Sequence, residues 1–163
     1  MKQKHEKRLI MYMEKKYLSL LMFPLLAGCI STNNSSKNSD DTKLDYSDFE
    51  ELKIEWKDLF LPAKSQYFAY IYSFSCSHCE HIKEDVLDTI NTLKDYFYLI
   101  EYSEEVPIVT NASETIGKER IEEVGILGTP TLLEISNGFL ALNIAGESEI
   151  TTYLSFLPHT VCT

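Results

Sequence analysis

The chain has 163 residues, of which 44% are hydrophobic and 12% aromatic, and it carries 15 bases and 25 acids for a formal net charge of −10. This length and apolar content fit one compact domain with appendages, which excludes collagen-like and fully disordered chains. Residues 1–28 hold six bases and two acids, so the rest carries 15 − 6 = 9 bases and 25 − 2 = 23 acids. Because so acidic a chain repels phosphate backbones, no nucleic acid is expected as a partner.

The first 28 residues have the pattern of a signal peptide. After a basic start, residues 17–28 form an apolar run of about a dozen residues, which is too short to cross a bilayer comfortably. The run ends in Leu26-Ala27-Gly28-Cys29, which resembles the lipobox of bacterial lipoproteins. The resemblance implies cleavage after residue 28, a diacylglycerol on the Cys29 sulfur, and a location at the extracytoplasmic face of a bacterial cell membrane. The alternative is an uncleaved membrane anchor with an incidental cysteine.

A polar segment separates the expected lipid anchor from the remaining chain. Residues 31–42 contain no large apolar side chain whose burial could offset the entropy of folding. Residues 29–44 are therefore predicted to be the lipidated cysteine and a flexible tether, with a root-mean-square span of roughly 20 Å. Residues 45–163 are predicted to form one domain.

The first half of that domain is expected to contain a central strand and a helix. Residues 67–74 form a nearly unbroken aromatic and β-branched run, which is typical of a strand buried on both faces. Apolar residues from Ile82 to Leu93 recur at helical spacing and predict an amphipathic helix of about four turns. A second strand is expected over 96–102, and a short strand with a helical turn ending at Pro62 is expected before residue 67.

The second half is expected to contain a helix, a hairpin and a closing helix. Asn111-x-x-Glu114 has the pattern of a capping box and predicts a helix through Val124. Residues 131–135 and 139–144 flank Asn137-Gly138, a strong signal for a two-residue hairpin turn. Residues 147–157 are expected to be helical. Strands alternating with helices predict the α/β class, with a central mixed sheet flanked by helices.

Cysteines supply the most specific signal for function. Apart from Cys29, the chain has Cys162 near its end and the motif Cys76-Ser77-His78-Cys79, which falls where the buried strand turns into the helix. A helix N-terminus stabilises a thiolate, so Cys76 is predicted to be a nucleophile with a lowered pKa. Cys79, one turn further along, is predicted to resolve mixed disulfides. Cys162 is interpreted as an incidental terminal thiol.

The motif and a second segment together resemble the thioredoxin superfamily. Residues 124–133, which include Gly128-Thr129-Pro130, look like the family's segment through its cis-proline, and the expected hairpin follows. The resemblance implies a thioredoxin-like fold in which Thr129 and Pro130 pack against the redox pair and bind the substrate backbone. It also implies that the Cys76–Cys79 disulfide is itself the redox group, with no metal or organic cofactor.

Details of the motif adjust this expectation. His78 resembles the residue before the resolving cysteine in protein disulfide isomerase and periplasmic oxidases, which implies a more oxidising pair than in thioredoxin. Tyr70 stands where many relatives have a buried carboxylate, and Ser75 replaces the family's tryptophan. Proton transfer to or from Cys79 must then use water or another group.

The sequence therefore predicts a membrane-tethered extracytoplasmic thiol-disulfide oxidoreductase. Its expected substrates are exported proteins or peptides that contain cysteine, and an integral membrane redox protein is expected, by family analogy, to exchange electrons with it. The alternative is a surface lipoprotein that binds a protein or peptide and in which Cys76–Cys79 is a static structural disulfide.

Two metal interpretations of the motif are weaker. Cys76, Cys79 and His81 could supply three zinc ligands, but the remaining candidates for a fourth, His5, His159 and Cys162, are distant in sequence. Covalent haem attachment requires histidine directly after the second cysteine, where this chain has Glu80. No metal is expected at the motif.

Overall fold

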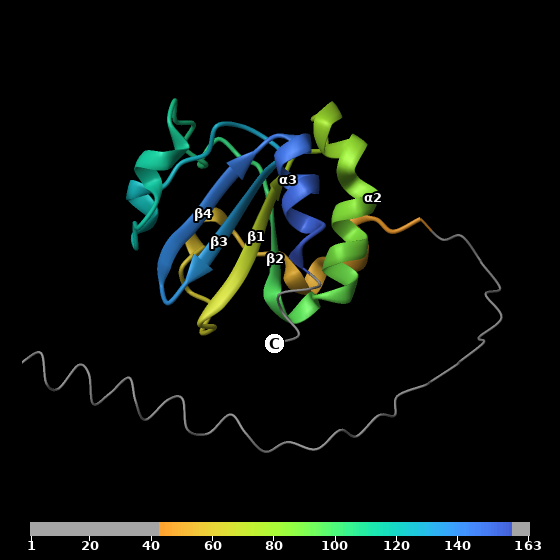
Figure 1. Ribbon diagram of the computed structural model, residues 1–163, viewed down its shortest axis with the longest axis horizontal. Helices are drawn as coiled ribbons and strands as arrows, with labels where there is room; N and C mark the ends of the chain where they lie inside the picture. Colours follow the sequence, from red (N-terminus) through yellow and green to blue (C-terminus); the bar gives the residue numbers. More distant parts are fainter. Residues whose placement is uncertain (1–42, 158–163) are drawn as a thin grey trace, which may run out of the picture. The chain divides into compact units, whose positions relative to one another are not determined.

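The computed structural model describes residues 43–157, which form a four-stranded mixed sheet with helices and loops on its two faces (Figure 1). The predicted signal peptide, the lipid site Cys29 and most of the tether lie outside these residues, as does Cys162. Within the described part of the chain, no helix is long and apolar enough to cross a membrane.

The strands lie in the order β2-β1-β3-β4. β1 (Gln66–Tyr72) pairs in parallel with β2 (Phe97–Glu101), and α2 (Ser77–Thr92) connects the two. β3 (Thr131–Ser136) runs antiparallel to β1 and forms a hairpin with β4 (Phe139–Ala145), after which α3 (Glu147–Leu154) closes the domain. The predicted α/β class and mixed central sheet are confirmed.

β1 is the central strand and is buried on both faces, as its sequence predicts. Successive side chains of a strand point to opposite faces of the sheet. Phe68, Tyr70 and Tyr72 therefore face α2, whereas Tyr67, Ala69 and Ile71 face away from it. The strand ends at Tyr72, two residues earlier than expected, and Phe74 is exposed.

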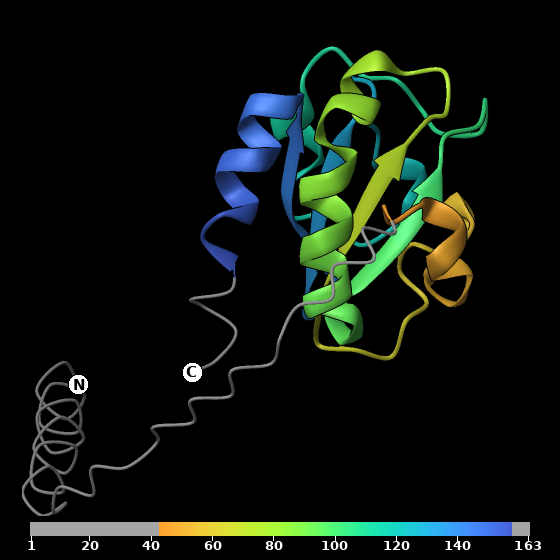
Figure 2. The same ribbon diagram turned by 90° about the vertical axis from the view of Figure 1, so that its right-hand side faces the viewer.

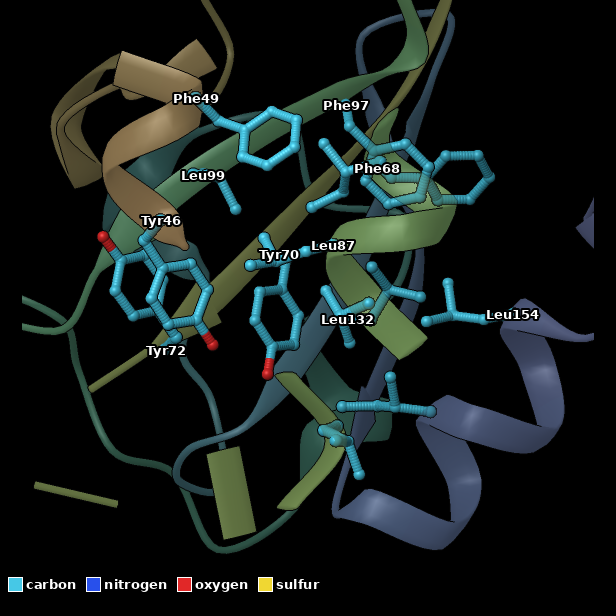
Figure 3. Packing of buried hydrophobic residues seen from close by; sticks show 14 of the residues in the cluster. Tyr46, Phe49, Phe68, Tyr70, Tyr72, Leu87, Phe97, Leu99, Leu132 and Leu154 are labelled. Carbon is cyan, nitrogen blue, oxygen red and sulfur yellow. The ribbon is translucent and has the colours of Figure 1, made fainter. Parts of the chain in front are cut away.

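The face of the sheet covered by α2 and α3 forms the helix-side core (Figure 2). α2 buries apolar residues at helical spacing, as expected, and α3 adds Ile150 and Leu154. The rings of Tyr46 and Tyr72 stack with centroids 3.8 Å apart, and Tyr70 lies beside them (Figure 3). The helix-side core consists of these buried residues: Tyr46, Phe49, Leu52, Phe68, Tyr70, Tyr72, Cys79, Ile82, Val86, Leu87, Ile90, Phe97, Leu99, Leu132, Ile150, Leu154 and Leu157.

The N-terminal segment before β1 forms two 3-10 helices, η1 (Tyr46–Leu52) and η2 (Trp56–Asp58). Asp45 caps η1 and also pairs with Lys83 of α2, which ties this segment to the helix. The short strand expected here is reduced to one bridge, in which the Ile54 N–H donates to the Leu99 carbonyl at 2.9 Å.

The opposite face forms the loop-side core, which is covered by η2 and by the long connection between β2 and β3. Within that connection the Ile126 N–H donates to the Pro107 carbonyl at 2.9 Å, and the Val109 N–H donates to the Ile126 carbonyl at 2.8 Å. The loop-side core consists of these buried residues: Trp56, Leu59, Tyr67, Ala69, Ile71, Ile100, Val106, Val124, Ile126, Leu133, Ile135 and Leu140.

The helix predicted over 111–124 is wrong. The segment contains only two 3-10 turns, η4 (Ala112–Thr115) and η5 (Ile121–Glu123). The Glu114 carboxylate accepts from the Asn111 side chain, not from the backbone N–H that a capping box requires. Gly117 adopts a φ of +80°, and its N–H donates to the Leu140 carbonyl at 2.8 Å. Pairing with the edge strand β4 therefore replaces the helical hydrogen bonds.

The remaining predicted elements occur with small changes at their ends. The hairpin turns at Asn137 and Gly138, whose φ angles of 51° and 82° are the left-handed values that a two-residue turn requires. α3 begins at Glu147, as expected, and its continuous helix ends at Leu154 rather than at residue 157.

Candidate functional site

Cys76 is the N-cap of α2. Its backbone is extended, with φ −92° and ψ 112°, and the Cys79 N–H donates to its sulfur at 3.2 Å. A side-chain acceptor at this position satisfies one of the free N–H groups of the first helical turn. The abrupt change from β1 to α2 thus places the Cys76 sulfur at the positive end of a 16-residue helix, as the sequence predicts.

The two thiols of the motif differ in access to solvent. Cys76 is half-buried, whereas Cys79 is only 1% exposed and belongs to the helix-side core. Both cysteines are free thiols. A molecule in solution can therefore reach the sulfur of Cys76, and Cys79 is reached through Cys76.

The loop that precedes β3 also contacts Cys76. The Thr129–Pro130 peptide bond is cis, and the Cys76 thiol donates to the Thr129 carbonyl at 3.3 Å across a separation of 53 residues. The Gly146 N–H donates to the Pro130 carbonyl at 3.0 Å, which fixes the loop to the start of α3. The structure thus brings together Cys76, Thr129 and Pro130, the residues that the two sequence motifs singled out.

The pKa values of the two thiols shift in opposite directions. Burial acts to raise the pKa of Cys76, but hydrogen bonding with Cys79, Thr129 and two backbone N–H groups outweighs burial and lowers that pKa overall. Burial raises the pKa of Cys79 to about 11, and the neighbouring Cys76 adds to the rise. Cys76 is therefore the thiol that ionises first.

Tyr70 lies behind the pair, at the position where the sequence lacks an expected carboxylate. Its hydroxyl is buried beside the hydroxyl of Tyr46, whose pKa is likewise raised above its ordinary value by burial. Burial raises the pKa of Tyr70 far above its ordinary value. Tyr70 stays protonated at physiological pH and provides no base for Cys79.

His78 is exposed and turns toward α3. Its Nδ1 lies 3.0 Å from Oε2 of Glu147, and Nδ1 of His81 lies 3.4 Å from the same oxygen. Hydrogen bonding to His78 lowers the pKa of Glu147. Sequence analysis did not find Glu147, because no local pattern connects it with a helix that begins 70 residues earlier. Among residues 43–157, these three side chains are the ones whose donor atoms converge as metal ligands would.

Two exposed apolar side chains border the motifs. Phe74, two residues before Cys76, is 66% exposed, and Leu127, two residues before Thr129, is 47% exposed. Phe74 packs edge-on against the buried ring of Tyr72, with centroids 5.4 Å apart. Phe74 was expected to belong to the buried strand, but it lies beyond the end of β1 and faces solvent.

Comparisons with known proteins reveal structural likeness only. No protein-family model matches the chain, and no curated protein matches its sequence. Chlamydomonas reinhardtii thioredoxin f2 aligns with 67% of this chain and 95% of its own, with 10% identity and a TM-score of 0.44. Spinach chloroplast thioredoxin f aligns with 63% of this chain and 88% of its own, with 14% identity and a TM-score of 0.44. Mitochondrial thioredoxin 3 of Saccharomyces cerevisiae aligns with 63% of this chain and 92% of its own, with 13% identity and a TM-score of 0.40.

The fold assignment does not depend on these likenesses. It rests on the β1-α2-β2 unit, the antiparallel hairpin with α3, and the cis-proline at the start of β3. The fold is therefore thioredoxin-like and α/β. It holds a pair of thiols at a helix N-terminus, one accessible and one buried, against a cis-proline loop.

Proposed function

We propose that the protein is a thiol-disulfide oxidoreductase whose redox group is the Cys76–Cys79 pair. The observation that carries this proposal is the contact of the half-buried Cys76 sulfur with both the Cys79 N–H, at 3.2 Å, and the Thr129 carbonyl, at 3.3 Å. A half-buried sulfur thus lies beside the half-buried Thr129, and a second thiol lies one helical turn away.

The chemistry follows from the different access of the two thiols. In the reduced protein the Cys76 thiolate attacks one sulfur of a substrate disulfide, forms a mixed disulfide and releases the other substrate sulfur as a thiolate. Cys79 then passes its proton to water, attacks the Cys76 sulfur and releases the second substrate sulfur as a thiolate. Two electrons pass from the cysteine pair to the substrate. The same steps in reverse oxidise a substrate dithiol.

Neighbouring residues have supporting roles in this proposal. Thr129 and Pro130 align the substrate backbone beside Cys76, and Phe74 and Leu127 offer apolar contacts to its side chains. His78, in the first turn of α2, adds positive charge near the Cys76 thiolate when its imidazole is protonated, which favours the reduced pair and makes the disulfide more oxidising.

We further propose that the domain acts outside the cytoplasm, tethered to the membrane by lipid on Cys29. The support is the apolar run ending in Leu26-Ala27-Gly28-Cys29 and the polar segment that follows. The proposed substrates are exported proteins or peptides with cysteines. The cysteine pair stores only two electrons. A membrane redox protein would therefore exchange electrons with it.

Trapping of mixed disulfides tests the proposed function. A Cys79→Ser variant keeps the attacking sulfur and removes the resolving one, so it should accumulate mixed disulfides with extracytoplasmic proteins that a reductant releases. The matched control is Cys76→Ser, which should trap at least tenfold less. If both variants trap equally little under oxidising conditions, the pair is a static disulfide and the protein is a binding module.

A further inference from the structure

Two imidazoles and one carboxylate meet where the first turn of α2 faces the start of α3. His78 and His81 are three residues apart and therefore lie on the same face of α2. Their Nδ1 atoms lie 3.0 and 3.4 Å from a single oxygen, Oε2 of Glu147. The donor atoms of the three side chains lie within 4.8 Å of one another, and the two rings are perpendicular rather than stacked.

We propose that His78, His81 and Glu147 form a binding site for a divalent transition-metal ion of the Zn²⁺ class. Imidazole nitrogen and carboxylate oxygen are ligands that Zn²⁺ takes, at about 2.0–2.2 Å. Two such ligands of one tetrahedral ion lie about 3.4 Å apart, which is close to the 3.0 and 3.4 Å that separate the two imidazole nitrogens from Oε2 of Glu147. All three side chains are accessible to solvent, so water completes the coordination.

The contacts of Glu147 favour an ion over a simple pairing of charges. Within residues 43–157, no lysine or arginine pairs with this carboxylate, and its partners are the two imidazoles. A hydrogen bond between exposed groups contributes little to stability, whereas coordination would join α2 to α3. The excess of acids over bases also raises the local concentration of cations.

This site differs from the zinc set considered from the sequence, which consisted of Cys76, Cys79 and His81. It uses no sulfur and therefore does not require the cysteine pair to be reduced. Its third ligand comes from a different helix, 69 residues beyond His78. The metal site shares only His78 with the proposed redox site, so a test in a chain without cysteines distinguishes failure of the metal site from failure of the proposed function.

Calorimetric titration with Zn²⁺ alone tests the site. The full chain with all four cysteines replaced by serine removes competing thiolates, and the chain carrying Cys29→Ser and Cys162→Ser, oxidised so that no free thiol remains, serves as a second preparation. Both should bind one Zn²⁺ saturably, and the temperature of unfolding should rise with Zn²⁺ concentration. Unfolding curves without metal establish that each variant is folded.

Three variants in the cysteine-free chain locate the ligands. The double variant His78→Gln/His81→Gln should lose the saturable site, and Glu147→Gln should weaken binding by about tenfold or more. Glu149→Gln, an exposed carboxylate in the same turn of α3, should leave affinity unchanged. The proposal is overturned if saturable binding is absent, if the double variant binds as tightly as the parent, or if Glu149→Gln weakens binding as much as Glu147→Gln.

Discussion

The helix-side core and the loop-side core lie on opposite faces of one sheet and are covered in different ways. Regular helices with apolar residues at helical spacing cover most of the first, and the 3-10 helix η1 completes the cover. The second is covered by 3-10 turns and by a connection whose backbone hydrogen bonds reach distant residues, such as that from Gly117 to Leu140. Local periodicity determines one face, and long-range pairing determines the other.

The candidate site lies where these two kinds of structure meet. Cys76 and Cys79 belong to α2, whose position depends on the helix-side core. Thr129 and Pro130 follow Ile126, which is part of the loop-side core. Geometry at the sulfur of Cys76 therefore depends on both faces. Substitutions that weaken the packing of one core at a time separate the contributions of the two cores to this geometry.

The largest effect is expected from a cavity in the helix-side core. Leu87 of α2 is fully buried, so Leu87→Ala should lower the free energy of unfolding by about 2–5 kcal/mol. Urea denaturation measures this loss as a lower midpoint of the unfolding transition, while the dependence of the unfolding free energy on urea concentration stays the same. Leu61→Ala, at an exposed leucine, is the matched control and should change stability by less than about 0.5 kcal/mol. Equal losses in the two variants would contradict the assigned packing of α2.

A comparably large contrast is expected between the two thiols of the pair. The lowered pKa of Cys76 and the pKa of about 11 for Cys79 give Cys76 far more thiolate near pH 7. In the reduced protein, iodoacetamide should therefore modify Cys76 more than a hundredfold faster. The Cys76 rate should level off at a lower pH than for an ordinary thiol, as peptide mass spectrometry can follow. Equal rates would show that the helix N-terminus does not act on Cys76.

A steric change in the loop-side core is expected to have an intermediate effect. A Cβ at Gly125 would lie 2.5 Å from Cγ1 of Val109 and 2.9 Å from the Pro107 carbonyl oxygen. Gly125→Ala should therefore destabilise the protein by about 1–3 kcal/mol, measured by urea denaturation. Gly117→Asn is the control, because its Cβ meets nothing within 4 Å and asparagine tolerates its φ of +80°. If Gly125→Ala lowers stability no more than this control, the connection between β2 and β3 is less tightly packed than described.

The smallest effect concerns the pairing of the N-terminal segment with α2. Hydrogen bonding from Lys83 lowers the pKa of Asp45 below 3.8 in the folded protein. Because the folded pKa is the lower one, the stabilisation is present above pH 3.8 and is lost as pH falls through the folded pKa. The Asp45 side chain is 48% exposed, so the contribution is below about 1 kcal/mol.

Comparison with Asp45→Asn measures this contribution. The difference in unfolding free energy between the parent and the variant should be constant near neutral pH and should shrink as pH falls below 4. Glu51→Gln, at an exposed position of η1, is the control for the loss of a carboxylate that does not pair with Lys83. A difference that grows on acidification would reverse the sign of the assigned interaction.

Much of the helix-side architecture could be predicted because its signals are local. The unbroken apolar run of β1, the helical spacing in α2, and Asn137-Gly138 each lie within one short segment. The contact between Cys76 and the Thr129–Pro130 loop could be predicted because each of the two motifs lies beside a segment with a clear local signal. Here the structure agrees with the prediction that these motifs come into contact.

Prediction failed where distant residues determine the backbone. Nothing within residues 111–124 shows that the Gly117 N–H will bond to Leu140 on the edge strand, so the capping pattern at Asn111 misleads. Glu147 was missed for the same reason, since its approach to His78 depends on the packing of α3 beside α2. The pairing of Asp45 with Lys83 likewise has no sequence signal.

The central claim is that Cys76 and Cys79 form a redox-active pair, and a glutathione titration tests it most directly. The full chain carrying Cys29→Ser and Cys162→Ser leaves this pair alone, and alkylation with mass measurement reads its state. We predict reversible exchange with a potential near or above about −180 mV. A value near about −270 mV would retain the activity but contradict the role of His78. A pair that stays oxidised below about −300 mV would contradict the claim and indicate a structural disulfide.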